Sequence, residues 1–172
     1  MKNIKLILTL LAILLLVSSC EDDGGTSKID LVAGATPNIT KDPSLDGFID
    51  FLKLSDGETI TIGSTIDVAQ GDVASMDIVG FYKKGTDVYK TTFETNVTTF
   101  PATITLTQDD LIDAFAELNS ASDFGLGDQL TITAVLTLKD GSILKIINDD
   151  GTPNYGADTA NSIQYKVIQE TL

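Results

Sequence analysis

The sequence predicts an all-β protein, an antiparallel β-sandwich with one short inserted helix at about residues 108–119. About seven or eight short segments alternate apolar with polar residues, and turn-forming residues separate them every 8–12 positions. These segments are rich in threonine, isoleucine and valine, whose branched side chains suit a pleated sheet. A single helix among the strands is too little for a repeating β–α–β fold.

The first element along the chain is a short hydrophobic segment that ends before the only cysteine. Lys2 and Lys5 precede the apolar run 6–17, and two serines separate this run from Cys20. A positive start, an apolar centre and small residues before a cut are typical of a secretory signal. The run is shorter than the roughly 20 apolar residues that a membrane-spanning helix needs. We therefore expect residues 1–19 to be a cleaved signal peptide.

A polar segment comes after the cysteine. Residues 20–28 contain acids, glycines and serine, and they have too little apolar surface to fold by themselves. Residues 29–32 are apolar enough to begin a strand, but Pro37 and Pro43 interrupt the next stretch of the chain. We assign residues 20–44 to an acidic, polar tether, with a first strand inside it as the alternative. We assign residues 45–172 to the β-sandwich domain.

The clearest strand of the domain is 129–139, where leucine, isoleucine and alanine occupy every second position. Its other face carries mostly threonine, so we expect that face to lie nearer water. Asp140-Gly141 predicts a two-residue hairpin, and 83–86 predicts another turn. Residues 76–82 are apolar on both faces, which favours a central strand. The remaining predicted strands are 48–54, 59–65, 88–93, 102–107, 142–147 and 161–170.

The inserted helix has a clear start signal. Thr107 is a good helix N-cap, and two acidic residues follow in what would be the first turn, where they suit the helix dipole. Leu111, Phe115 and Leu118 then fall on one stripe at helical spacing. This pattern predicts a helix over 108–119 that lies across an end or edge of the sheet.

Composition excludes several classes of function. The chain has 25 acidic residues against 11 basic ones, all lysine, and a net charge of −14, so it should repel nucleic acid. Histidine, arginine and tryptophan are absent, and Cys20 is the only thiol. The usual catalytic bases, anion clamps and nucleophiles are therefore mostly missing, and we expect no enzyme activity.

The residues around Cys20 resemble a known export signal. Aliphatic residues and two serines before Cys20 resemble the lipobox of bacterial lipoproteins, in which the cysteine is lipidated and becomes the mature N-terminus. The acidic residues 21–23 that come next resemble the signal of Bacteroidota-type surface lipoproteins. The resemblance implies a lipid anchor on Cys20 and display on the outer face of the outer membrane, with a periplasm-facing orientation as the alternative.

The body of the domain carries a second resemblance. Residues 100–106, the predicted helix, 127–128 and 138–141 are similar to small immunoglobulin-like lipoproteins that accompany nutrient-uptake systems of the starch-utilisation type. This resemblance implies an immunoglobulin-like or fibronectin-III-like sandwich that binds glycan or peptide without catalysis, beside an outer-membrane importer. The alternative is a structural or interaction subunit that docks on another outer-membrane or envelope protein.

Two loops hold candidate binding residues. Calcium takes six to eight oxygen ligands, and one polar loop offers several; the candidate ligands are Asn148, Asp149, Asp150, Asn154 and Asp158. A solvated loop in which the same residues only form turns is the other interpretation. Asp123 and Asp128, on either side of two glycines, form a weaker calcium candidate.

Two aromatic residues also lie in predicted loops. Phe124 and Tyr155 are candidates for a ligand-contact surface, since exposed aromatic rings often make such contacts. The alternative is that each folds back onto the sandwich.

Overall fold

The computed structural model describes residues 34–154 and 161–169. Cys20, Tyr155 and Asp158 lie outside the described residues, as do the signal predicted at 1–19 and most of the predicted tether. Within the described part, no helix has the length and the apolar character needed to cross a bilayer.

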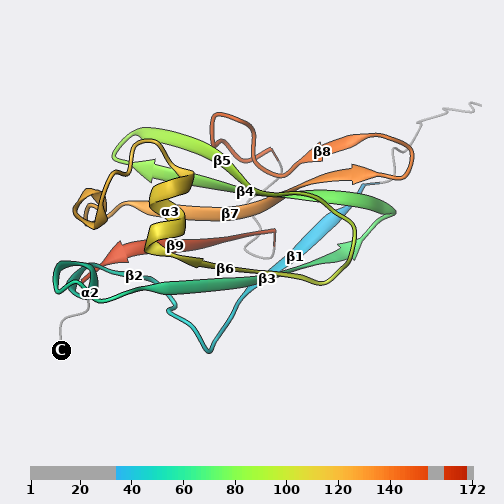
Figure 1. Ribbon diagram of the computed structural model, residues 1–172. Helices are drawn as coiled ribbons and strands as arrows, with labels where there is room; N and C mark the ends of the chain where they lie inside the picture. The colour runs from blue at the N-terminus through green and yellow to red at the C-terminus, as the bar shows by residue number, and fades with distance from the viewer. Residues whose placement is uncertain (1–33, 155–160, 170–172) are drawn as a thin grey trace, which may run out of the picture. The chain divides into compact units, whose positions relative to one another are not determined.

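Two β-sheets lie one above the other and form a sandwich (Figure 1). The smaller sheet has the strand order β1-β3-β6, with β1 (Thr36–Lys41), β3 (Thr61–Gln70) and β6 (Ala102–Thr107). The larger sheet has the order β2-β9-β7-β4-β5, with β2 (Ile49–Asp50), β9 (Ser162–Ile168), β7 (Gln129–Leu138), β4 (Val73–Lys84) and β5 (Asp87–Val97). A short strand, β8 (Ile143–Lys145), pairs with β7. The predicted all-β sandwich is confirmed.

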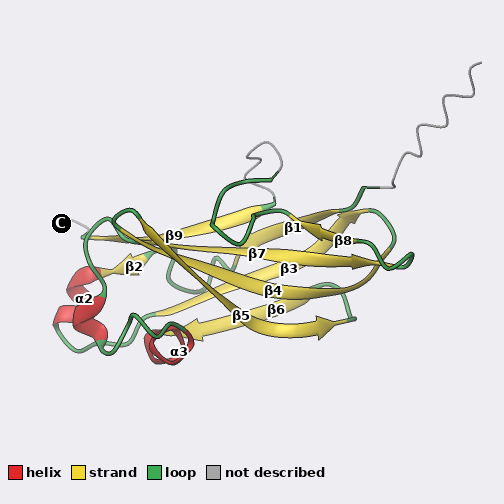
Figure 2. Cartoon of the chain, turned by 90° about the horizontal axis from the view of Figure 1, so that it is seen from above, coloured by secondary structure: helices red, strands yellow, loops and turns green. Residues whose placement is uncertain are grey.

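Helical segments lie at one end of the sandwich, away from the middle of the sheets (Figure 2). They are α2 (Phe51–Ser55), α3 (Gln108–Ala114) and a single 3₁₀ turn, η1 (Ala121–Asp123). The pairs between strands are antiparallel except for the two-residue pair of β2 with β9, which is parallel.

The main core fills the space between the two sheets. Alternate residues of the central strands point inward and are almost completely buried, among them Ile62 in β3, Ile78 in β4 and Ile132 in β7. Burying such a side chain contributes about 1.5–3 kcal/mol, so this interior is the main source of stability. As predicted from its apolar faces, β4 is central, between β7 and β5.

A second, smaller hydrophobic cluster covers the outer face of the larger sheet. Val79 and Phe81 of β4 pack there against Ile146 and Ile147, which come directly after β8. Thr133 lies opposite Val79 on β7, is fully buried, and donates its hydroxyl to a backbone carbonyl. The expectation that this face of β7 lies near water is therefore wrong, because the chain after β8 folds back over it.

The N-terminal strands differ most from the prediction. The first strand, which the sequence analysis gave as an alternative within the tether, exists as β1 and pairs with β3 of the smaller sheet. Pro37 is tolerated because β1 is an edge strand. The strand predicted over 48–54 is a two-residue strand followed by α2, since the Asp50 carboxylate caps that helix by accepting the Leu52 amide hydrogen.

The helix α3 begins where the sequence predicts and ends earlier. Thr107 and Asp110 form a capping box, which fixes the first turn. The helix stops at Ala114 rather than at residue 119, and Phe115 already has extended backbone geometry. Phe115 and Leu118 are nevertheless buried. All three residues of the predicted apolar stripe therefore lie in the core, although only Leu111 lies in the helix.

Candidate functional site

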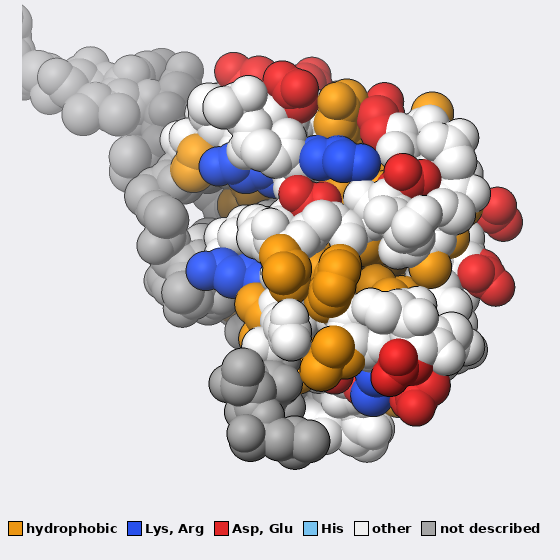
Figure 3. Space-filling view, turned by 90° about the vertical axis from the view of Figure 1, so that its left-hand side faces the viewer, with side chains coloured by type: hydrophobic (Ala, Val, Ile, Leu, Met, Phe, Trp, Pro, Cys, Tyr) orange, Lys and Arg blue, Asp and Glu red, His pale blue; other side chains and the backbone are white. Residues whose placement is uncertain are grey.

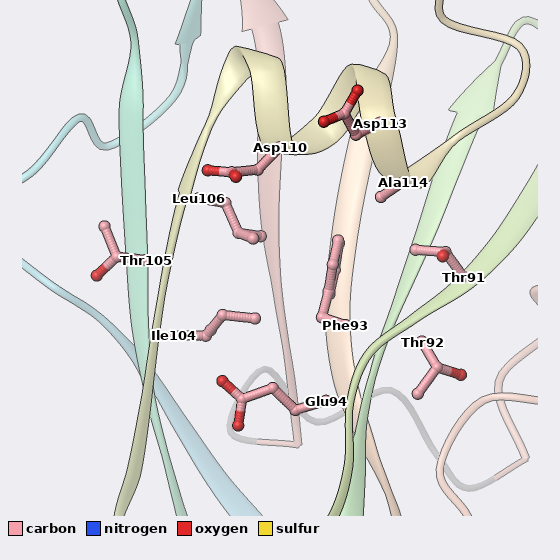
Figure 4. Close-up of a pocket in the computed structure, with 10 residues that line it drawn as sticks. All are labelled: Thr91, Thr92, Phe93, Glu94, Ile104, Thr105, Leu106, Asp110, Asp113 and Ala114. Carbon is pink, nitrogen blue, oxygen red and sulfur yellow. The ribbon is translucent and has the colours of Figure 1, made fainter.

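An open cleft of about 470 Å³ lies between the edge strands of the two sheets, β5 and β6 (Figure 4). Each of these strands is the last in its sheet. The helix α3 contacts both strands and crosses one end of the gap between them. The cleft is therefore a place where the sandwich is not closed by a further strand.

The position of α3 over the cleft follows from its cap and its buried face. The Thr107 backbone N–H and hydroxyl both donate to Asp110 Oδ2, at 2.8 and 2.7 Å. These hydrogen bonds, the backbone one first, lower the pKa of the Asp110 carboxyl below its usual value, so it stays ionised. Leu111 is fully buried and fixes the helix to the core. Asp110 and Asp113 are left on the side of the cleft.

The floor of the cleft is apolar. Phe93 of β5 lies across from Ile104 and Leu106 of β6 (Figure 4). The Phe93 ring packs edge to face on Phe115, with 6.1 Å between ring centroids. A Cβ atom at Gly80 would lie 2.4 Å from a Phe93 ring carbon, so the glycine in β4 leaves the room that this ring needs.

The rim of the cleft is acidic. Of the ten described residues that line it, three are acidic and none is basic. Asp110 and Asp113 lie at the α3 end and Glu94 lies toward the other end (Figure 4). An apolar floor inside an anionic rim suits a ligand that combines an apolar body with a positive charge.

The loop that offered calcium ligands has another organisation. Asp149 accepts hydrogen bonds from Lys90 and Lys145, both at 2.6 Å. The bond from Lys145 and then that from Lys90 lower the pKa of Asp149 to about 2. Asp150 accepts the backbone N–H and the hydroxyl of Thr152, which closes a turn. Both carboxylates therefore have protein donors as partners.

The amide side chains of this loop are also engaged. Asn148 Nδ2 donates to Thr152 Oγ1, and Asn154 Nδ2 donates to the Lys145 carbonyl. Across the described ranges, no three His, Cys, Asp or Glu side chains are placed to hold a metal ion. The four described candidates therefore have partners within the protein, and the fifth, Asp158, lies outside the described residues. The loop instead fastens the chain over the second hydrophobic cluster.

Phe124 belongs to the core. Its side chain is 1% exposed, and its ring meets Tyr82 in a T-shaped contact with 5.9 Å between centroids. The prediction of a contact surface at Phe124 is wrong, because the loop folds back onto the sandwich.

The weaker calcium candidate is also structural. Asp128 is buried, and its Oδ2 accepts the Tyr82 hydroxyl and the Gly125 N–H, each at 2.9 Å. Asp123 accepts the backbone N–H groups of Asn119 and Ser120 at the start of η1. These two carboxylates hold the loop before β7 in place.

Sequence reasoning missed the cleft. Its lining comes from β5, β6 and α3, which follow one another along the chain, but the alternation of residues does not show that β5 and β6 belong to different sheets. The alternation of Thr103, Ile104, Thr105 and Leu106 predicted the strand. It did not predict that the strand would be the open edge of a sheet.

A second exposed feature lies at the end of the sandwich that carries α2 (Figure 3). Leu52, Leu126 and Ile168 are 39%, 56% and 39% exposed. The pairing of Asp50 with Ile168, and the hydrogen bond from the Gly127 N–H to the β9 backbone, bring their segments together. We call these three residues the apolar end patch.

No protein-family model, curated protein or solved structure matches this chain.

Proposed function

We propose that this protein is a non-catalytic, lipid-anchored binding module of the outer-membrane surface, an accessory of a nutrient-uptake system that takes its ligand in the cleft between β5 and β6. The observation that carries the proposal is the anionic rim around an apolar floor. In this proposal Cys20 carries the lipid anchor, and residues 21–28 are the polar tether predicted between the anchor and the domain.

Within the expected ligands, glycan or peptide, the cleft favours a cationic peptide. A lysine or arginine side chain has an apolar stem that suits Phe93 and Leu106, and a charged head that suits Asp113 or Glu94. Glycan sites rely on exposed aromatic faces, whereas Phe93 is the one aromatic residue among those that line the cleft, and its ring packs on Phe115.

Ligand preference is tested by titrating tetralysine or maltoheptaose into isotope-labelled protein and following the backbone amide signals. We expect tetralysine to shift the signals of Phe93, Leu106 and Asp113. The double variant Glu94→Gln, Asp113→Asn should bind tetralysine about tenfold more weakly, because two opposite charges near the ligand are lost.

The matched control is the double variant Asp56→Asn, Glu58→Gln, which removes the same charges from an exposed turn after α2. Equal weakening in both double variants would mean that tetralysine is attracted only by the net charge. Shifts of the cleft amides by maltoheptaose alone would show a glycan site instead.

The anchor is tested by growth with labelled palmitate. Label should enter the wild-type chain and not the Cys20→Ala variant, which should leave the membrane fraction. Protease added to intact cells distinguishes surface display, in which the protein is cut, from a periplasm-facing orientation. A Cys20→Ala variant that still sediments with membranes would contradict the anchor.

A docking subunit is the second candidate function, and the apolar end patch favours it. In that case Leu126→Asp should abolish co-purification with an outer-membrane partner while leaving tetralysine binding unchanged. The Glu94→Gln, Asp113→Asn variant should show the opposite pattern.

A further inference from the structure

The edges of the two sheets are not equally protected against pairing with another strand. Free edges usually carry proline, charge or a bulge, or are very short. The edge strand β1 has Pro37 and a register shift beside it, and β2 has only two residues. The edge strand β5 has register shifts against β4, a positive φ at Asn96, and the charged residues Lys90 and Glu94.

The edge strand β6 has none of these protections. Its sequence, Ala-Thr-Ile-Thr-Leu-Thr, contains no charge and no proline. It pairs with β3 in continuous register over all six residues, from Ala102 to Thr107. In the described part of the chain no strand lies on its other side.

The hydrogen-bonding direction of β6 is set by its neighbour. The Asp42 N–H donates to the Gly63 carbonyl, so Gly63 of β3 directs its backbone groups toward β1. Gly63 lies opposite Thr105. Because the backbone groups of Gly63 face β1, Gly63 and Thr105 form a non-hydrogen-bonded pair of the antiparallel ladder. By the same alternation Thr103 and Thr105 turn their N–H and C=O groups to the free edge, beside the cleft.

We propose that β6 binds an extended polypeptide as an added strand, with lysine or arginine at every second position of the bound segment. The inference rests on the proposed function of the cleft and names its ligand. A bound segment of about six residues would run the length of β6, because both strands advance ~3.3 Å per residue. Hydrogen bonds to Thr103 and Thr105 would hold its backbone.

Alternate side chains of the added strand would enter the cleft. There they would cover Phe93 and reach Glu94 and Asp113, while the others would lie beside the exposed side chains of Thr103 and Thr105. The helix α3 crosses one end of the cleft, so it would limit the bound segment at that end.

Charge selects a cationic peptide over a second copy of this chain. A copy paired through its own β6 would bring the same three carboxylates against those of the first, and each chain has a net charge of −14. A lysine-bearing strand instead places opposite charges together in a partly desolvated cleft.

The test uses a fluorescein-labelled, capped nine-residue peptide that alternates valine and lysine, with binding followed by fluorescence anisotropy. Thr105→Pro removes an N–H that faces the free edge and leaves the bonds to β3 intact, because proline is tolerated on edge strands in that orientation. We expect the peptide to bind this variant about tenfold more weakly. Thr105→Val keeps the N–H and separates the loss of the backbone donor from the loss of the hydroxyl, so it should bind the peptide more tightly than Thr105→Pro does.

Two measurements on the unaltered protein keep the test decisive if Thr105→Pro fails to fold. A peptide methylated on alternate backbone nitrogens keeps its charge and cannot pair, so it should bind about tenfold more weakly. Amide hydrogen exchange of Thr103 and Thr105 should slow in the complex, which attraction between charges alone would not cause.

The outcomes separate the two proposals. If methylation, Thr105→Pro and amide exchange have no effect while Glu94→Gln, Asp113→Asn weakens binding, strand addition is overturned and the cationic cleft stands. If the double variant Glu94→Gln, Asp113→Asn also binds the peptide as tightly as wild type, both strand addition and the cationic cleft are overturned. If the protein alone sediments as a dimer that Thr105→Pro dissociates, a second copy occupies β6 and the inference is also overturned.

Discussion

At the scale of single residues, the most informative group is the buried carboxylate of Asp128. Polar groups are buried without large cost only when they are hydrogen-bonded, and Asp128 accepts the Tyr82 hydroxyl and the Gly125 N–H. Burial first, and then the hydrogen bond to Asp128, raise the pKa of Tyr82, so the phenol stays neutral and remains a donor. The pair joins β4 to the loop before β7.

Replacing Tyr82 by phenylalanine should destabilise the protein by about 1–3 kcal/mol, because Asp128 would lose a donor while it stays buried. Urea unfolding of the variant and the wild type measures this difference. Tyr89→Phe is the control, since Tyr89 is half-buried and its hydroxyl has no hydrogen-bond partner among the described residues, and we expect a much smaller change. Equal effects of the two substitutions would contradict the assigned role of Tyr82.

Asp149 provides a prediction of pH dependence. Its pKa is about 2 in the folded protein against a usual value of 3.8, because Lys145 and Lys90 donate to it. The stabilisation is therefore complete above about pH 4 and is lost as the pH falls through about 2. A carbon-detected NMR titration should find this pKa.

In the variant Lys145→Met the pKa of Asp149 should rise toward 3.8, whereas Lys166→Met, on the exposed face of β9, should leave it unchanged. A pKa near 3.8 in the wild-type protein would show that the two lysines do not hold this carboxylate.

At the scale of elements, boundaries set by local chemistry were predicted well. The β4–β5 hairpin turns at Gly85, which has a positive φ, and the turn after β7 places Gly141 in the same region. The strand 102–107 and the start of α3 match the sequence prediction. The end of α3 does not, because Phe115 and Leu118 reach the core from non-helical backbone.

The capping box at the start of α3 should be measurable. Thr107→Ala removes the side-chain half of the box and should destabilise the protein by about 0.5–2 kcal/mol in thermal unfolding. Thr107→Ser keeps the hydroxyl and should lie close to wild type. If Thr107→Ala also unfolds at the wild-type temperature, the cap does not determine where α3 begins.

At the scale of the whole molecule, the loop after β8 acts as a cover for the larger sheet. Ile146 and Ile147 pack on Val79 and Phe81, and Asp149 joins Lys90 of β5 to Lys145 of β8. This explains why β4 is apolar on both faces and why Thr131 and Thr133 of β7 are buried. The acidic and amide residues of the loop are used for its own turns and ion pairs.

Calcium should therefore leave the stability of the protein unchanged. Melting temperatures in millimolar calcium and in excess chelator should agree, because Asp149 and Asp150 already have protein donors as partners. A higher melting temperature in calcium that is lost in Asp150→Asn would contradict this and restore the calcium interpretation of the loop.

The sequence by itself determined the class of fold, most strands, the two hairpin turns and the start of α3, because alternation, glycine turns and caps act over a few neighbouring residues. Only the tertiary structure decided that Phe124 and Asp128 are buried, that the loop after β8 covers a sheet, and that β6 is an open edge beside an acidic cleft. Those properties depend on which distant segments meet when the two sheets close on each other, and on which strand then has no neighbour.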